Sequence, residues 1–506
     1  MQPALRLEPE DDSNQRLLAA VHPADWTNPE PADRYNLVVL GAGTAGLVSA
    51  AGAAGLGAKV ALVERHLMGG DCLNVGCVPS KAVLRAAGAI HAARAAGNFG
   101  VTLAGDPGIS FSHAMARMRK LRADIAPNDG AARFQKLGVD VFLGAGRFTG
   151  PDTLEVGGRT LRFARAVIAT GARAMLPPIP GLAEAGSLTN ETVFSLTELP
   201  RRLAVIGAGP IGCELAQAFR RFGAAVTVLA IDDQLLPRED ADAAALVRAA
   251  FEREGITLAL GTSIKRVERV DGGKCITFTR AQGGPDSTVI VDAILVAAGR
   301  APNVDDVGLE AAGVEFDHRK GVRVDARLRT SNRRIFAAGD VAGQYQFTHA
   351  ADAMARIVLR NALFFGRART DSLIVPWATY TDPEVAHVGI NQKQADANTD
   401  VATLTIPMKD VDRAILEGDT DGFARVHVDR KGRILGATIV ARHAGEMIAE
   451  LSLAMTAGIT MGQIAQTIHP YPTQSEVIKK LADAHSRTRL TPGVRRFFTW
   501  LLAKRR

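Results

Sequence analysis

Short apolar segments alternate with Ala- and Gly-rich segments along most of the chain. The mostly apolar segment 36–40 precedes a Gly-rich turn at 41–46, a small-residue helix predicted over 47–57 and a second apolar segment at 59–63. Nearly continuous apolar strands are typical of parallel sheets that are covered on both faces. The pattern therefore predicts a βαβ unit that ends at Glu64 and opens an α/β fold.

The same order of strand, turn, helix and strand recurs over 202–229. Both turns have the spacing Gly-x-Gly-x-x-Gly, in which the glycines let a pyrophosphate approach the helix N-terminus. We therefore expect two dinucleotides to bind, the first with its ribose on Glu64, 23 residues after Gly41. The candidate contacts are Gly41, Gly43, Ala45 and Gly46 in the first turn, and Gly207, Gly209, Pro210, Ile211 and Gly212 in the second.

Later apolar strands complete these units and then give way to a different pattern. The strands at 166–171, 294–300 and 335–340 each end in a small-residue turn or a carboxylate. After Pro376, strands are followed by a long helical stretch at 444–457, which is typical of a separate α+β domain. The length of 506 residues is sufficient for about three domains.

The first 34 residues are polar and punctuated by Pro23, Pro29 and Pro31. We interpret residues 1–34 as an arm on the surface, with the first regular element beginning at Tyr35. Acidic side chains occupy the positions where a secretory signal would carry positive charge and an apolar core.

Composition narrows the class of protein. The net charge of +7 is modest for this length, and no basic stripe with interleaved aromatic residues indicates nucleic-acid binding. No apolar segment is long enough to span a membrane. Four cysteines in so long a chain do not make a secreted disulfide framework, which indicates a cytoplasmic location.

Two of these cysteines lie in the run 69–81, GGDCLNVGCVPSK. Cys72 and Cys77 are separated by four residues, a spacing that lets them close a small disulfide ring at the start of a predicted helix. The positive end of the helix dipole and a nearby lysine favour the thiolate form of Cys77. We interpret the two isolated cysteines, Cys213 and Cys275, as buried apolar residues.

With this run, the two dinucleotide turns and the segment Ala338-Gly339-Asp340 in that order, residues 35–485 resemble the class I pyridine nucleotide-disulfide oxidoreductases. That family includes dihydrolipoamide dehydrogenase, glutathione reductase and mercuric reductase. The resemblance implies FAD on the first turn, NADPH or NADH on the second, and a homodimer that completes each active site with the partner subunit. It implies an FAD-binding domain at 35–180 and 301–375, an NAD(P)-binding domain at 181–300, a dimerisation domain at 376–485 and a basic amphipathic tail at 486–506.

The resemblance also implies roles for individual residues. Cys77 is the thiol nearest the flavin, and Cys72 is the interchange thiol that attacks the substrate. Lys81 lies beside the flavin and pairs with Glu214, while Asp340 binds FAD. Further FAD or nucleotide contacts are implied at Gly70, Gly146, Thr170, Gly171, Gly299, Arg300 and Thr348.

One segment departs from the family's disulfide reductases, which carry a His–Glu acid–base pair that reaches across the dimer. Here Tyr471 takes the place of that histidine, two residues after His469, and Glu476 is kept. A phenol, with an ordinary pKa near 10, is a poor base at neutral pH unless His469 substitutes. Tyrosine at this place is similar to mercuric reductase, yet the chain lacks that enzyme's C-terminal cysteine pair.

Coenzyme choice stays open between NADPH and NADH. The position that corresponds to Glu64 in the second unit is Ala230, so the acidic residue that selects NADH is absent. Arg238 is the nearest cation downstream, which slightly favours NADPH. The tail at 486–506 is interpreted as a surface or dimer-stabilising helix, with contact to a membrane surface as the alternative.

These observations predict an FAD-dependent NAD(P)H oxidoreductase with a redox-active Cys72–Cys77 disulfide. Its acceptor is a disulfide, a protein disulfide or a thiol-reactive metal ion, and no resident metal site is predicted. Two alternatives remain: a flavin-dependent quinone or diaphorase-type reductase, and a redox-sensing flavoprotein with low turnover.

Overall fold

The first βαβ unit forms where the apolar pattern predicts it. In a computed structural model, which describes residues 5–105, 108–280, 283–343 and 345–506, strand β1 (Tyr35–Leu40) pairs in parallel with β2 (Val60–Glu64). Helix α2 (Thr44–Gly55) connects the two strands. The strand bounds agree with the prediction within a residue because buried strands leave a strong apolar signal.

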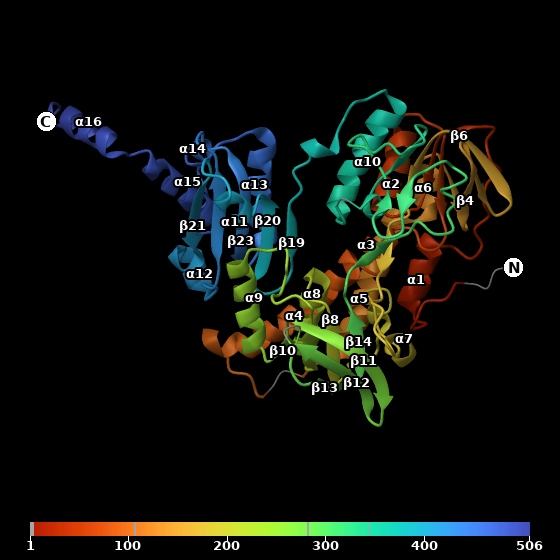
Figure 1. Cartoon of the computed structure of the whole chain (residues 1–506), viewed down its shortest axis with the longest axis horizontal. Helices are drawn as coiled ribbons and strands as arrows, with labels where there is room; N and C mark the ends of the chain where they lie inside the picture. The colour runs from red at the N-terminus through yellow and green to blue at the C-terminus, as the bar shows by residue number, and fades with distance from the viewer. Residues whose placement is uncertain (1–4, 106–107, 281–282, 344) are drawn as a thin grey trace. The chain divides into compact units, whose positions relative to one another are not determined.

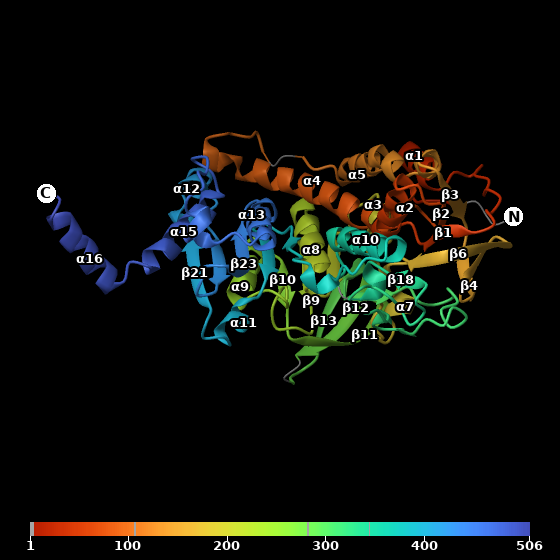
Figure 2. The same ribbon diagram turned by 90° about the horizontal axis from the view of Figure 1, so that it is seen from above.

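This unit is the centre of a seven-stranded sheet with the order β3-β2-β1-β6-β5-β4, in which β18 also pairs with β6 (Figures 1 and 2). The strands β1, β2, β3, β6 and β18 pair in parallel, whereas β4 and β5 form an antiparallel extension. The additional strands are β3 (Val139–Leu143), β4 (Gly146–Gly150), β5 (Thr153–Val156), β6 (Arg159–Ile168) and β18 (Ile335–Ala337).

Both faces of this sheet are covered. One core joins β1 and β2 to the helices α2 and α10, and a second core on the opposite face joins the same strands to β4–β6 and the segment 304–322. The helices of this part are α3 (Gly70–Asn74), α4 (Cys77–Ala95), α5 (Phe111–Ile125), α6 (Ala131–Lys136), α7 (Leu182–Ala185) and α10 (Thr348–Leu363).

The N-terminal segment corrects one prediction, because its first regular element is not β1. Helix α1 (Asp12–Val21) begins at the N-cap Asp11, whose side chain accepts a hydrogen bond from the Asn14 N–H at 2.8 Å. Leu17 and Val21 are fully buried in the same core as β1. The prolines that indicated an irregular arm all follow this helix, so its short apolar pattern was missed.

The second βαβ unit also forms as predicted, with β8 (Arg202–Ile206) in parallel between β9 (Ala225–Leu229) and β14 (Ala293–Val296). Helix α8 (Pro210–Phe222) follows the second Gly-rich turn. Further strands within the first 373 residues are β7 (Ala172–Ala174), β11 (Thr262–Val270), β12 (Gly273–Arg280), β13 (Ser287–Val291), β15 (Arg300–Pro302), β16 (Phe316–Asp317) and β17 (Gly321–Val322).

The α+β pattern after Pro376 forms a five-stranded antiparallel sheet with the order β19-β20-β23-β22-β21 (Figure 1). Helices α13 and α15 contact this sheet and share its core. Its strands are β19 (Trp377–Thr379), β20 (Glu384–Gly389), β21 (Ala402–Pro407), β22 (Phe423–Val428) and β23 (Ile434–Ala441). Its helices are α11 (Gln392–Asp396), α12 (Asp412–Glu417), α13 (Ala444–Ala457), α14 (Met461–Ile464), α15 (Glu476–Thr488) and α16 (Pro492–Ala503).

By compactness the chain divides into two units. The first contains the residues up to Gly207, with Ala218–Leu229 and Ser263–Leu373. The second contains Ala208–Gln217, Ala230–Thr262 and the residues from Ile374 onward, and so includes α9 (Ala241–Arg253) and β10 (Thr257–Ala259). The predicted α/β class is confirmed, and the predicted domain boundaries stay predictions.

Candidate active site

The first Gly-rich turn has the close backbone approaches that its sequence predicts. Gly41 has φ +102°, and a Cβ there would lie 2.3 Å from the carbonyl oxygen of Ala169. A Cβ on Gly46 would lie 1.8 Å from the Gly41 carbonyl oxygen, whereas one on Gly43 would meet nothing closer than 3.8 Å. The turn is therefore packed on its inner side and open at Gly43.

Helix α2 begins directly at this open side. Its N-cap is Gly43, and no side chain caps the first turn. The first backbone N–H groups of a helix and the positive end of its dipole form a site for a phosphate group. The residues present therefore fit the pyrophosphate of FAD.

Glu64 contributes to the same turn from the end of β2. Its carboxylate accepts hydrogen bonds from the Ala42 N–H at 2.7 Å and from the His66 N–H at 2.8 Å. Burial raises the pKa of Glu64, and these backbone donors oppose that effect. The carboxylate thus orders the turn itself, and its contact with a ribose stays a prediction.

An ion cluster lies at Asp340. The Nε atom of Arg300 is 3.3 Å from Asp340 Oδ2, and the same guanidinium donates to Asp71 and to the Ala172 carbonyl oxygen. Burial raises the pKa of Asp340, which the positive charge of Arg300 opposes. Asp71 was missed as a site residue, although its place beside Cys72 in the sequence was a signal.

The two cysteines of the run lie next to each other as free thiols. Cys77 is the first residue of α4 and follows the N-cap Gly76, while Cys72 lies in α3. A hydrogen bond with Cys77, and then burial, raise the pKa of the Cys72 thiol. The Oγ1 atom of Thr348 lies 3.4 Å from Cys77 Sγ, so the first turn of α10 faces the pair.

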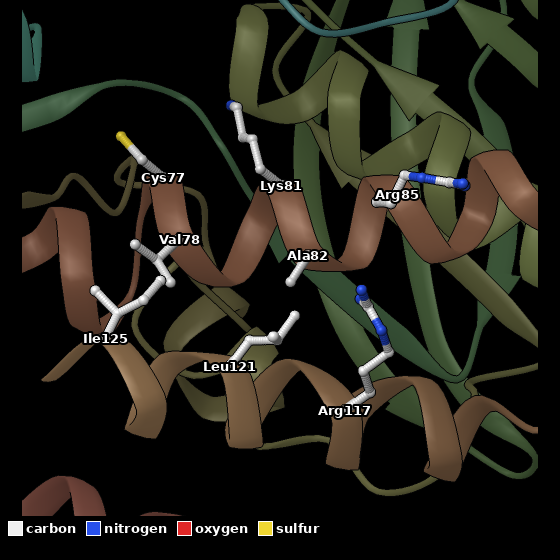
Figure 3. Close-up of a pocket in the computed structure, with 8 residues that line it drawn as sticks. All are labelled: Cys77, Val78, Lys81, Ala82, Arg85, Arg117, Leu121 and Ile125. Atoms are coloured by element: carbon white, nitrogen blue, oxygen red, sulfur yellow. The ribbon is translucent and has the colours of Figure 1, made fainter.

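Lys81 lies one helical turn after Cys77, and both side chains point away from α5 (Figure 3). On the other side of α4, an open groove of about 410 Å³ separates it from α5. Arg85 and Arg117 lie at the polar end of this groove. The lining residues are Cys77, Val78, Lys81, Ala82, Arg85, Arg117, Leu121 and Ile125.

The second Gly-rich turn repeats the geometry of the first. Gly207 has φ +114°, and a Cβ there would lie 2.4 Å from the Ala297 carbonyl oxygen. A Cβ on Gly209 would meet nothing within 4 Å, directly before α8 begins at Pro210. These residues fit a second pyrophosphate. In the loop after β9, Ala230 is buried and Arg238 is exposed, and the coenzyme preference stays a prediction.

The remaining predicted contacts lie in short turns at the strand ends. Thr170 donates its hydroxyl to the Asn303 carbonyl oxygen at 2.7 Å, and the neighbouring Gly171 has φ +70°. Gly299 has φ +119°. A Cβ on Gly146 would lie 2.7 Å from a side-chain atom of the buried core, so packing alone requires glycine there. Their cofactor contacts stay predictions.

Glu214 is buried on α8 and is held by the loop that follows β19. Its carboxylate accepts a hydrogen bond from the Tyr380 N–H at 3.0 Å. One turn later, the Gln217 amide donates to the Asp382 carbonyl oxygen at 2.9 Å and accepts from the Asp382 N–H at 2.8 Å. Gln217 was not among the predicted site residues. Lys81, the predicted partner of Glu214, belongs to the other compact unit, so that pairing stays a prediction.

The structure corrects the expected partner of Tyr471. Its exposed hydroxyl donates to Asp412 Oδ2 at 2.9 Å rather than to Glu476. This hydrogen bond, and then the charge of Asp412, raise the pKa of Tyr471. Within the described part of the chain, the buried Oε2 atom of Glu476 has no hydrogen-bond partner, while its Oε1 atom lies 3.6 Å from Lys480 Nζ.

His469 also has a side-chain partner, since its Nε2 atom lies 2.9 Å from Glu450 Oε1.

The two isolated cysteines differ from each other in burial. Cys213 is buried as predicted, and burial raises the pKa of its thiol to about 12. Cys275 on β12 is only half-buried.

Known proteins match almost the whole chain. A family model described as pyridine nucleotide-disulphide oxidoreductase matches residues 35–355, and the dimerisation domain of the same family matches residues 375–482. The chain belongs to this family. The dimerisation-domain match supports a homodimer, and the family consists of oxidoreductases that bind FAD and a pyridine nucleotide.

The relatives are named for different reactions. The chain is 36% identical to a mercuric reductase of Lysinibacillus sphaericus, over 89% of this chain and 82% of the relative. It is also 36% identical to a dihydrolipoyl dehydrogenase of Thermus scotoductus, over 89% and 97% of the two chains. The HOCl-induced flavoprotein disulfide reductase RclA of Escherichia coli, solved also as a Cu(II) complex, superimposes with a TM-score of 0.79 at 29% identity, over 89% and 99%.

Among the residues that the structure describes, none of the helices is long and apolar enough to cross a membrane. In the same residues, no group of three or more His, Cys, Asp or Glu side chains is arranged to hold a metal ion.

Proposed function

We propose that this protein is an FAD-dependent NAD(P)H oxidoreductase that passes electrons through Cys72 and Cys77 to a thiol-reactive acceptor. The observation that supports this most is the thiol pair at the N-terminus of α4, with Thr348 against it. The dipole of α4 and the hydroxyl of Thr348 both favour the thiolate form of Cys77. We also propose a cytoplasmic location, where the thiols would be regenerated by the coenzyme rather than by the compartment.

Two half-reactions balance the electrons. The first consumes NAD(P)H, a proton and the Cys72–Cys77 disulfide, and it yields NAD(P)⁺ and two thiols. Bound FAD supplies the two-electron transfer between the nicotinamide and the cysteine pair. The residues of the chain would orient this exchange. Helix α4 presents Cys77 with Cys72 beside it, and the ion pair of Arg300 and Asp340 would contact FAD. In the second half-reaction the dithiol returns to the disulfide and gives two electrons to the acceptor.

A thiophilic metal ion is the acceptor that we favour. Reduction of an external disulfide needs a group that protonates and deprotonates the interchange thiol near neutral pH. Tyr471 stands where the family's histidine would, and its bond to Asp412 moves its pKa further from neutrality. Reduction of two Cu(II) to two Cu(I) oxidises the dithiol and releases two protons, with no leaving thiol to protonate. The Cu(II) complex of RclA supports this choice.

The decisive experiment is an anaerobic titration of the FAD-loaded protein with NADPH and, separately, with NADH. We expect two new reactive thiols per chain and a long-wavelength flavin absorption band with one of the coenzymes. Cys72→Ser and Cys77→Ser should each abolish the gain in thiols, whereas Cys275→Ser, on half-buried β12, should retain it. Flavin bleaching without new thiols would overturn the relay and favour a quinone reductase.

The acceptor is then tested on the protein reduced by the better coenzyme. Steady-state oxidation of the coenzyme is compared for Cu(II), Hg(II), lipoamide and oxidised glutathione, with Cys72→Ser as the control. We expect activity that depends on Cys72 to be highest with a metal ion. Equal or higher turnover with a disulfide would remove metal ions as the favoured acceptor while leaving the dithiol relay intact.

A further inference from the structure

The C-terminal segment has a charge pattern that the redox site does not use. Between residues 486 and 506 the chain carries seven Lys and Arg residues and no Asp or Glu. The segment contains α16 (Pro492–Ala503), whose N-cap Thr491 accepts a hydrogen bond from the Val494 N–H. The charge of this segment therefore equals the net charge of +7 of the whole chain.

Helix α16 is amphipathic. At about 100° per residue, one face carries most of its apolar side chains, while Arg496 lies on the opposite face and Arg495 and Lys504 lie at the borders. Trp500 lies outside this apolar face, between Arg496 and Lys504. None of the residues of α16 is buried, and Phe497 and Trp500 remain 55% and 53% exposed. The apolar face consists of Val494, Phe497, Phe498, Leu501 and Leu502.

The length of α16 determines how it can meet a bilayer. Twelve residues form a helix about 18 Å long, which is too short for a hydrocarbon core of about 30 Å. A helix with one apolar face and a cationic remainder instead lies in the plane of the headgroups. Trp500, with Lys504 4.2 Å from its ring centroid, places an amphipathic ring and an ammonium group together, as headgroup-level anchors do.

Charge complementarity distinguishes the partners that could cover the apolar face of α16. A second copy of the chain offers the groove between α4 and α5, but its polar end carries Arg85 and Arg117, which repel a cationic helix. A nucleic acid would pair with the cations and leave the apolar face uncovered. An anionic bilayer satisfies both, because the phosphates meet the cationic side chains while the acyl boundary covers the apolar face.

We propose that α16 docks this protein on anionic phospholipid membranes, lying parallel to the surface with its apolar face inserted. The redox chemistry would then take place at a membrane surface. This proposal is independent of the acceptor, because α16 contains none of the residues of the thiol or nucleotide sites.

The test is co-sedimentation of the full-length, FAD-loaded protein with vesicles. We expect at least tenfold more bound protein with vesicles of phosphatidylcholine and phosphatidylglycerol than with phosphatidylcholine alone, and a decrease with added salt. Trp500 fluorescence should shift to the blue on binding, and Trp500→Phe should remove that shift. Equal binding to both vesicles, or no shift, would overturn the proposal.

Variants separate the possible partners. Arg495→Glu/Arg496→Glu and Phe497→Ser/Phe498→Ser should each reduce vesicle binding at least tenfold, while coenzyme oxidation in solution is unchanged. The matched control, Arg333→Glu/Arg334→Glu, reverses an exposed arginine pair elsewhere and should retain binding. Loss of the dimer on removal of residues 490–506 would assign the helix to a second copy. Binding of duplex DNA without binding of vesicles would assign it to nucleic acid, and either result overturns the membrane proposal.

Discussion

The hydroxyl of Thr348 contacts the thiol pair. Its Oγ1 atom lies 3.4 Å from Cys77 Sγ, and a hydrogen bond to Thr348 also lowers the pKa of Cys72 against the larger effects that raise it. A hydroxyl that donates to a thiolate stabilises the charged form. We predict that Thr348→Val, in a Cys72→Ser background, slows alkylation of Cys77 by iodoacetamide at pH 7 about tenfold.

The matched variant is Thr348→Ser, which keeps a hydroxyl and should keep the alkylation rate within about twofold. The measurement is the pH profile of that rate, whose midpoint gives the pKa of Cys77. An unchanged midpoint in Thr348→Val would show that Thr348 serves only packing or cofactor contact.

Glu239 is a buried acid in the second unit that connects the start of α9 to β19. Its Oε1 atom accepts a hydrogen bond from the Trp377 ring N–H at 2.6 Å, and its Oε2 atom has no hydrogen-bond partner within the described residues. Burial raises the pKa of Glu239 from 4.5 to about 7, and the charge of Asp240 adds to this. The folded state therefore prefers the protonated acid.

The sign of the pH dependence follows from this preference. The stability that protonated Glu239 contributes is fully present below pH 4.5 and is lost as pH rises through about 7. Glu239→Gln keeps a carbonyl acceptor for Trp377 and does not ionise. We predict that its free energy of unfolding exceeds that of the wild type by about 3 kcal/mol at pH 8, with little difference at pH 4.5.

Thermal or denaturant unfolding of both proteins between pH 4.5 and 8 measures this difference. Glu310→Gln, at an exposed position, is the control and should follow the wild type throughout. A difference for Glu239→Gln that is independent of pH would contradict ionisation as its cause.

Sequence could identify side chains that define a motif, but not those that depend on distant neighbours. The glycines at 41 and 207 and the cysteines at 72 and 77 were predicted because spacing alone specifies their geometry. The partner of Tyr471 was predicted wrongly, since Asp412 lies 59 residues away in sequence and no local pattern connects the two. Glu239 was missed for the same reason.

At the scale of elements, helix α1 shows how a short amphipathic pattern can be overlooked. Residues 1–34 were interpreted as an arm on the surface, but Leu17 is fully buried in the structure, where it joins the core of β1 and α2. We predict that Leu17→Ala costs about 2–5 kcal/mol of stability, because it leaves a cavity in that core. Gln15→Ala, on the exposed face of the same helix, should change stability by less than about 0.5 kcal/mol.

Urea unfolding followed by tryptophan fluorescence measures both variants, because the Trp26 ring N–H donates to the Val141 carbonyl oxygen at 3.2 Å, at the end of this region. Equal midpoints for the two variants would mean that α1 detaches without effect on the core. That result would restore the interpretation of residues 1–34 as an arm.

Helix α8 is fixed to the loop after β19 by Gln217, which is 1% exposed and whose amide bonds to both backbone groups of Asp382. The same loop donates the Tyr380 N–H to Glu214. We predict that Gln217→Ala leaves these buried backbone groups unpaired and costs about 1–3 kcal/mol. Its Tm should fall relative to Gln135→Ala, at an exposed helix position, and identical Tm values would contradict the clamp.

The bounds of these elements were largely predictable, whereas the contacts between elements distant in sequence were not. The strands β8, β9 and helix α13 have the predicted bounds because apolar runs and small-residue helices carry local signals. The contact between Gln217 and Asp382 joins residues 165 apart, which a single sequence does not reveal.

For the whole molecule, the match to a dimerisation domain raises the question of which subunit supplies Glu476. Its buried Oε2 atom is without a hydrogen-bond partner in the part of the chain that the structure describes, and Tyr471 nearby is 69% exposed. Both features agree with a segment that acts on the thiols of the partner subunit. A two-fold axis would then place each Cys72 opposite the Glu476 of the other chain.

Hybrid dimers test this directly. Cys72→Ser and Glu476→Gln subunits with different affinity tags are coexpressed, and the mixed dimer is purified through both tags. If the site is shared, one of its two sites combines an intact Cys72 with an intact Glu476, so we predict about half of the wild-type rate. If each subunit completes its own site, both sites are defective and the mixed dimer stays as slow as its parents. Because the two outcomes need no knowledge of the acceptor, any active electron acceptor suffices, and a Glu476→Gln parent with full activity would exclude the carboxylate from turnover.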